Sequence, residues 1–170
     1  MENIGMIRRI DNLGRLVIPK EIRNVLGIRS GDCIEIYTNN EKIILKKHNQ
    51  FERIFYIINP ILVSISKILN LDILITDTDK VLKSYGKNNS LFLNKKIDNF
   101  VYDNIVSRKI VIEQNKKLFI DNINYIINPL IANGDALGSI IFLKTENKIT
   151  KNDEIAMKII DNIFVNNLEL

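Results

Sequence analysis

The sequence predicts two domains of different class: a small β-rich domain with one short helix in residues 1–50, and an α+β domain in residues 51–170. The first observation is size, because 170 residues with 46% hydrophobic and 26% charged side chains suit one medium domain or two small ones. The second is a change near residue 50 from short β-branched runs to long stretches with helical spacing. The third is the later order of helix, two strands, helix, several antiparallel strands and helix, which is typical of an α+β fold.

The first fifty residues alternate between apolar runs and turn signals. Asn and Gly in residues 11–14 predict one turn, and residues 39–41 predict the turn of a hairpin. Pro19 suits the start of a helix, and Gly27 is well placed to end it. Between them, Ile22, Val25 and Leu26 have helical spacing. The apolar runs predict four short strands, over residues 4–10, 15–18, 33–37 and 43–45.

This first domain is small enough that a monomer would be only marginally stable. A module of its size buries only about 60% of the surface that its unfolded chain exposes. Two copies that share one sheet core would bury more apolar surface. Dimerisation is therefore expected on physical grounds.

The second domain begins with a predicted helix over residues 51–71, which is apolar on nearly all sides and should be buried. Asn59-Pro60 predicts a kink, or a stop followed by a new helix. Strands follow at 73–76 and 81–85, and Asn94 could cap a helix through Val106. The remaining predicted elements are strands at 110–112 and 118–120 around Lys116-Lys117, a hairpin of 125–132 and 136–143, and a final helix after the capping-box sequence Thr150-x-x-Asp153.

Residue counts exclude several kinds of site. One Cys and one His rule out an intramolecular disulfide and any site that needs two histidines, so we expect no metal and no cofactor. Cys33 is most simply a small buried hydrophobe. No nucleophile–base pair or Gly-rich phosphate loop is visible, so the chain is not expected to be an enzyme. No targeting or membrane-spanning segment is visible either, which favours the cytoplasm and no membrane partner.

Positive charge is concentrated in the first domain. Residues 1–50 contain nine Lys/Arg and six Asp/Glu, a net of +3, while residues 51–170 contain 15 and 14, a net of +1. Scattered surface lysines would give a similar excess, so the count alone decides nothing. The positions of the arginines are more informative.

The N-terminal sequence resembles the AbrB-type swapped-hairpin family of transcription regulators. The resemblance lies in Arg8-x-x-Asp11-x-x-Gly14-Arg15-Leu-Val-Ile-Pro-x-Glu-Ile-Arg23, followed by Gly31-Asp32 and the hairpin end 43–47. In that family two chains exchange hairpins to form one β-barrel that binds DNA. The domain order, with a less specific match around residues 129–138, further resembles family members that carry a C-terminal GAF-like domain and act in sporulation as activators and repressors.

The resemblance implies that arginines of the dimeric barrel face double-stranded DNA. The implied contacts are Arg8, Arg15 and Arg23, with Arg9, Lys20, Lys46 and Lys47 as weaker candidates. Asn24 stands where many relatives have another arginine, which removes one expected contact. Arginine suits the task because its planar fork binds phosphate oxygens or guanine edges bidentately. The alternative is a solvated face on which Arg8, Arg9 and Arg23 pair with Asp11 and Glu21.

Other partners follow from the same reading. If the helices of residues 51–71 pair between chains, dimers join into a tetramer, as the resemblance suggests. A GAF-like domain could sense a small-molecule effector; Lys83, Tyr85 and Tyr102 could line its pocket, but no ligand residue is assigned. Related barrels also serve as antitoxins or protein-interaction modules. That alternative predicts a disordered tail, and the well-patterned residues 51–170 argue against it.

Overall fold

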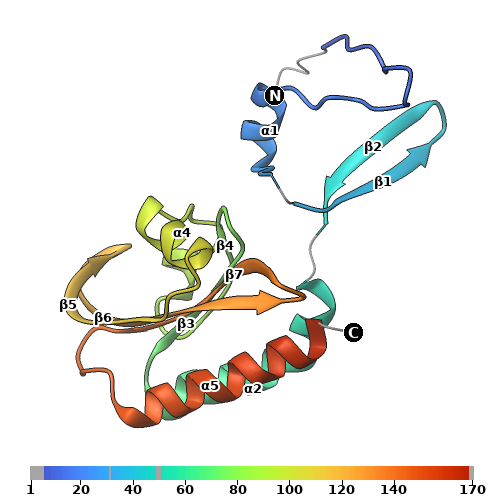
Figure 1. Ribbon diagram of the computed structural model, residues 1–170. Coiled ribbons are helices and arrows are strands. Elements are labelled where there is room, and N and C mark those ends of the chain that lie inside the picture. The colour runs from blue at the N-terminus through green and yellow to red at the C-terminus, as the bar shows by residue number, and fades with distance from the viewer. Residues whose placement is uncertain (1–5, 31, 49–50, 169–170) are drawn as a thin grey trace. The chain divides into compact units, whose positions relative to one another are not determined.

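The computed structural model describes residues 6–30, 32–48 and 51–168. The chain divides into two compact units, Met1–Asn49 and Gln50–Leu170. We call them the N-terminal and C-terminal units and describe each separately (Figure 1).

Among its described residues, the N-terminal unit contains one helix and one hairpin. Helix α1 (Lys20–Leu26) ends as expected at Gly27, whose left-handed φ of 63° suits glycine. Strands β1 (Ile34–Asn39) and β2 (Lys42–Lys47) form the predicted antiparallel hairpin, which extends from the pair Asn39–Lys42 to the pair Ile34–Lys47.

Two predicted strands of the N-terminal unit are wrong for this single chain. Residues 6–10 and 15–18 have no regular structure, although the turn between them is present; residues 4 and 5 of the first predicted strand lie outside the described residues. A strand needs a neighbour with which to pair, and among the described residues β1 and β2 pair with each other. Apolar side chains consequently remain in solvent: Ile7 is 97% exposed and Val17 is 76% exposed. Cys33 is predicted to be buried but is exposed, because the described residues of this unit form no core around it.

The C-terminal unit is built on a five-stranded antiparallel sheet, which confirms the α+β class. The strand order is β4-β3-β7-β6-β5. The predicted hairpin around residues 133–135 is present as the pair β6 and β7. The strands are β3 (Asp72–Thr76), β4 (Val81–Tyr85), β5 (Val111–Leu118), β6 (Ile120–Ala132) and β7 (Asp135–Lys144).

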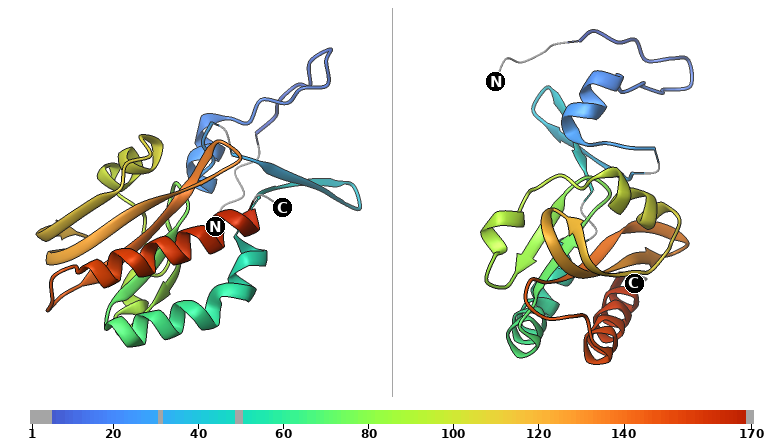
Figure 2. Two further views of the ribbon diagram at one scale, coloured as in Figure 1. Left: turned by 60° about the horizontal axis from the view of Figure 1, so that its bottom comes forward. Right: turned by 90° about the vertical axis from the view of Figure 1, so that its left-hand side faces the viewer.

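Helices cover both faces of this sheet, so the unit has three layers (Figures 1 and 2). Helices α2 (Glu52–Leu69) and α5 (Lys151–Leu168) pack on one face, and α3 (Asn89–Phe92) and α4 (Asn99–Val106) pack on the other. Successive residues of β3 point to opposite faces, so that Ile73 contacts the first layer and Leu74 the second. No helix among the described residues is long and apolar enough to cross a bilayer.

Helix α2 continues through Pro60 rather than stopping there. A proline inside a helix removes one backbone hydrogen bond and normally bends the axis. The ribbon of α2 bends along its length in Figure 2, in agreement with the kinked alternative. The expectation of burial on nearly all sides is only half met: Ile54, Phe55, Ile58 and Leu62 are buried, while Tyr56 is 90% exposed.

Two predicted boundaries in the C-terminal unit are wrong. The helix that ends at Val106 begins at Asn99, because Asp98 accepts the N–H of Val101 and caps it, while Asn94 lies in a left-handed turn. The predicted strand at 118–120 is interrupted by the left-handed residue Phe119, and β5 instead runs from Val111 through both lysines to Leu118. The pairing between β5 and β6 is irregular around Lys116, as at a β-bulge.

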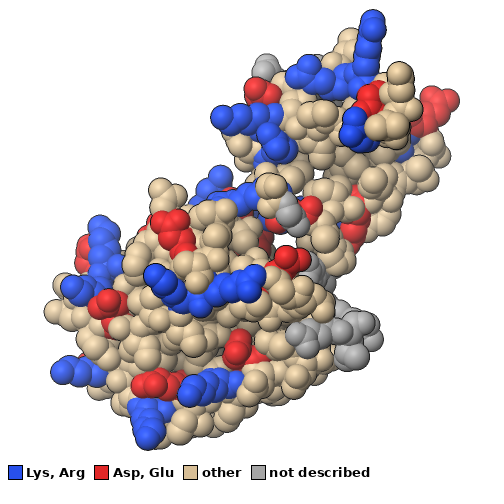
Figure 3. Space-filling model, viewed as in Figure 1, with Lys and Arg blue, Asp and Glu red and all other residues tan. Residues whose placement is uncertain are grey.

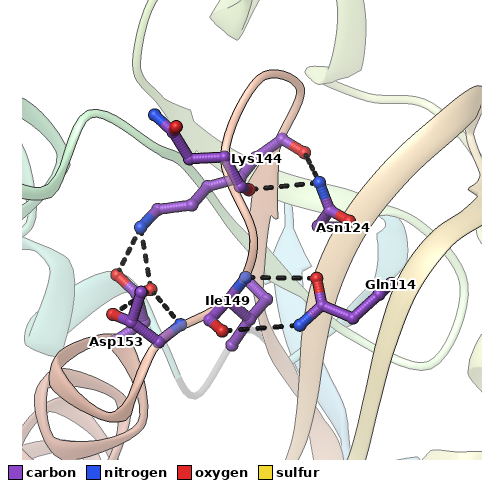
Figure 4. Close-up of polar contacts among 7 residues, drawn as sticks. Gln114, Asn124, Lys144, Ile149 and Asp153 are labelled. Carbon is purple, nitrogen blue, oxygen red and sulfur yellow. Dashed lines mark hydrogen bonds and ion pairs between the residues drawn. The ribbon is translucent and has the colours of Figure 1, made fainter.

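The start of α5 is fixed by a buried ion pair (Figure 4). Asp153 accepts the N–H and the hydroxyl of Thr150 at 2.7 and 2.8 Å, which confirms half of the expected capping box. Its two oxygens also accept bonds of 2.8 and 2.7 Å from the Nζ of Lys144, the last residue of β7. Nearby, the Gln114 side chain and the Ile149 backbone bond to each other, which ties β5 to the loop before α5.

Candidate nucleic-acid interface

Asp11 organises the turn that presents Arg15. Its Oδ1 accepts the backbone N–H groups of Leu13 and Arg15 at 2.9 and 2.8 Å. Its Oδ2 accepts a bond of 2.7 Å from Arg15 Nε. The backbone N–H of Arg15 and then its side chain hold the pKa of the Asp11 carboxyl below its usual value.

This pairing leaves the tip of Arg15 available. The bond uses Nε, so the two terminal nitrogens of the guanidinium, which form its fork, can still donate. The side chain is 71% exposed. An exposed guanidinium whose direction is set by a fixed turn suits an external anion, since less side-chain freedom is lost on binding.

Helix α1 carries two further candidates. Lys20 and Arg23 are exposed, and their spacing of three residues places them on the same side of the helix. Asn24, the departure from the related motif, is also exposed and follows Arg23 directly. The helix buries none of its residues within the single chain.

The two lysines at the end of the hairpin differ in environment. Lys46 is exposed on β2. Lys47 is half-buried: its Nζ lies 3.0 Å from Asp32 Oδ2 and donates to the carbonyl oxygen of Gly27 at 3.1 Å. Lys47 therefore ties β2 to the segment after α1.

Beside Lys46, the Glu35 carboxylate accepts from the Tyr37 hydroxyl and contacts Nδ1 of His48. The bond from Tyr37, followed by that of His48, holds the pKa of the Glu35 carboxyl below its usual value. His48 thus lies against β1 through this contact and through its backbone bond to Cys33.

Arg8 and Arg9 lie in the irregular segment before the turn, and both are exposed. The face of the N-terminal unit in Figure 3 shows basic side chains at several places with acidic ones among them. The single chain does not gather the seven predicted residues into one cluster of fixed geometry: three are in irregular segments, two on α1 and two on β2. Asp11, which the alternative interpretation paired with Arg8, Arg9 or Arg23, pairs with Arg15 instead.

No group of three or more His, Cys, Asp or Glu side chains suited to a metal ion occurs among the described residues. A sizeable cavity lies at an end of the sheet of the C-terminal unit and is lined in part by Tyr85. Lys83 and Tyr102, named with Tyr85 from the sequence, do not line it.

Comparison with known proteins agrees with this division. Residues 58–164 match the family described as stage V sporulation protein T C-terminal, transcription factor. Residues 7–53 match the family described as antidote-toxin recognition MazE, bacterial antitoxin.

Individual relatives cover both units. Stage V sporulation protein T of Bacillus subtilis is 32% identical over 154 residues, covering 86% of each chain. The transition state regulatory protein AbrB of the same organism is 54% identical over 48 residues, 28% of this chain and 50% of that protein. The cofactor-binding GAF domain of the nutrient sensor CodY from Clostridium difficile has a TM-score of 0.45 and 13% identity, over 60% of this chain and 80% of that one.

These matches define a transcription factor with an AbrB-type N-terminal region, in line with the expectation that the chain is not an enzyme. The chain belongs to the stage V sporulation protein T family.

Proposed function

We propose that residues 1–50 form a DNA-binding domain and that the chain regulates transcription by binding double-stranded DNA. The observation that carries the proposal is Arg15, an exposed guanidinium aimed by Asp11 within a segment that is 54% identical to AbrB. Arg8 and Arg23 supply the other principal contacts, with Arg9, Lys20, Lys46 and Lys47 at the edge. Lys47 ranks last because Asp32 engages it.

The DNA-binding form is a dimer in which two hairpins exchange to close a β-barrel. Segments 6–10 and 15–18 have no strand partner in the single chain, and their apolar side chains, such as Ile7 and Val17, are exposed. A second copy would supply the missing strand partner and cover these side chains. Each contact then occurs twice, so three arginines become six. In this form the protein activates some promoters and represses others, and the GAF-like C-terminal unit senses a small effector.

Titration of a labelled promoter duplex at several salt concentrations tests the proposal. If six phosphates are neutralised, the logarithm of the DNA association constant should fall with the logarithm of the salt concentration at a slope of about −5. Fluorescence anisotropy with the full chain measures both affinity and slope. Absence of binding at low salt would refute the proposal and favour the alternative, an antitoxin or protein-interaction module, to which the MazE match of residues 7–53 points.

Helix α2 offers a surface for joining two dimers. Ile57, Ile61 and Ile68 are 51%, 37% and 79% exposed, and their spacing places them along one side of the helix, which we call the α2 stripe. Leaving such a stripe in water is unfavourable, and pairing it with another copy removes it. We infer a tetramer held by the barrels and by the α2 stripes.

Light scattering on the full chain should therefore report four times the 19.7 kDa of one chain. Ile57→Asp places a charge in the α2 stripe and is expected to halve that mass, because a buried unpaired carboxylate is costly. The matched control is Val106→Asp, since Val106 is 55% exposed on α4, across the sheet from α2. A monomeric wild type would contradict both interfaces, and a tetrameric Ile57→Asp would contradict the α2 stripe.

A further inference from the structure

The cavity of the C-terminal unit has a volume of about 490 Å³. It lies where the end of α2, the start of β3, the end of β4 and the loop after β7 meet. Cavities of this size are typical of small-molecule sites. The chemistry of its wall indicates which class of molecule fits.

Asp72 places a buried carboxylate in this wall. The residue is only 6% exposed. Its oxygens accept the backbone N–H of Asn88 at 3.1 Å and the side-chain amide of Asn88 at 2.8 Å. In the described part of the chain, no Lys, Arg or His nitrogen lies within 4.0 Å of it. An ionised carboxylate accepts about four hydrogen bonds, so Asp72 has spare acceptor capacity and lacks a countercharge.

The neighbouring backbone is shaped to this carboxylate. A Cβ on Gly86 would lie 2.0 Å from Asp72 Oδ1, and Gly86 has a φ of 126° that L-residues rarely adopt. The turn after β4 thus passes directly over the carboxylate. Ser84, in the same wall, has a buried Oγ with no hydrogen-bond partner in the described structure. Two buried polar groups in one wall are therefore incompletely satisfied.

Basic groups line the same cavity. Lys67 and Lys87 contribute exposed side chains, and Glu146 a further acid. The wall therefore carries charges of both signs in equal number. A polyamine would meet two like charges, and a simple anion would leave Asp72 without a countercharge. A metal ion is disfavoured because no cluster of three acidic or soft ligands is present among the described residues.

We propose that this cavity binds a free α-amino acid, with its ammonium group on Asp72 and its carboxylate on Lys67 and Lys87. An ammonium supplies the countercharge and donors that Asp72 lacks, and a zwitterion matches a wall of balanced charge. This site rests on the proposed effector role of the C-terminal unit and gives it a location and a ligand class.

The test measures the melting temperature of the full chain, without DNA, in the presence of each common amino acid added singly. At least one amino acid is expected to raise it in a saturable way, since ligands that bind the native state stabilise it. Calorimetry should show that the N-acetyl derivative of that amino acid, which lacks the ammonium, does not bind. Putrescine should not bind either.

Asp72→Asn is nearly isosteric and should weaken binding at least about tenfold, because the ammonium loses its countercharge. The matched control is Asp121→Asn, which changes an exposed acid that pairs with Lys117. If Asp72→Asn does not fold, Lys87→Gln alters an exposed residue and should weaken binding through the carboxylate.

No stabilisation by any amino acid, or equal binding of the acetylated derivative, would overturn the site. Unchanged affinity in Asp72→Asn would overturn it as well. The DNA titration requires no amino acid, so failure of this site and failure of the regulatory function are separate results.

Discussion

Asp153→Ala is expected to lower the free energy of unfolding by about 3–5 kcal/mol, because it leaves the buried ammonium of Lys144 without its partner. The side chains of Lys144 and Asp153 are 8% and 0% exposed, so the variant leaves the ammonium buried without its countercharge. The same change removes the two bonds to Thr150 that fix the start of α5. Urea unfolding of the full chain, followed by circular dichroism, measures the loss.

A second ion pair in the same unit provides the control. Lys117 and Asp121 lie 3.3 Å apart, but their side chains are 78% and 73% exposed. Asp121→Ala should cost less than about 1 kcal/mol, since exposed pairs contribute little. The double variant Lys144→Met with Asp153→Leu should recover much of the stability, because an apolar pair needs no countercharge. Equal losses for Asp153→Ala and Asp121→Ala would contradict the role assigned to burial.

The ion pair also shows where inference from sequence ends. The sequence predicted a capping box at Thr150 and Asp153, because cap contacts are local and follow residue spacing. It did not predict Lys144 as the partner of Asp153, because that contact depends on where β7 ends relative to α5. Asp98 rather than Asn94 caps α4 for a related reason: both residue types cap helices, and the sequence pattern did not distinguish them.

The candidate interface was predictable to a similar depth. The spacing from Arg8 to Arg23 identified the turn, α1 and the family, because these features are local. The ion pairs of Asp11 and Lys47 required three-dimensional structure. The predicted strands at 4–10 and 15–18 are absent from the described residues because their pairing depends on a neighbouring strand. The sequence contained one weak indication at Asp72, which is an acidic residue at the start of an apolar strand. Its burial beside the cavity was not predicted.

Arg15→Ala is expected to weaken DNA binding at least about thirtyfold, because a hydrogen bond to a charged phosphate is worth about 1.5–3 kcal/mol and the dimer loses two such contacts. Loss of two phosphate contacts should also make the salt slope shallower by about 2. The fold should be unaffected, since the side chain is 71% exposed and its backbone bonds to Asp11 do not need the guanidinium. Anisotropy titrations of wild type and variant on the same duplex measure both effects.

Lys42→Ala removes one positive charge from the same unit, as Arg15→Ala does. The comparison therefore distinguishes a direct contact between Arg15 and DNA from general electrostatic attraction by the net charge of the unit. Lys42 is exposed at the turn of the hairpin, outside the predicted contacts. If Arg15 binds DNA directly, Arg15→Ala should lose far more affinity than Lys42→Ala, while light scattering reports the same oligomer for both. Equal, small losses would mean that the net charge of the unit attracts DNA without a specific arginine. Unchanged affinity in Arg15→Ala would place the DNA-binding face elsewhere on the barrel, and the turn set by Asp11 would then serve the fold alone.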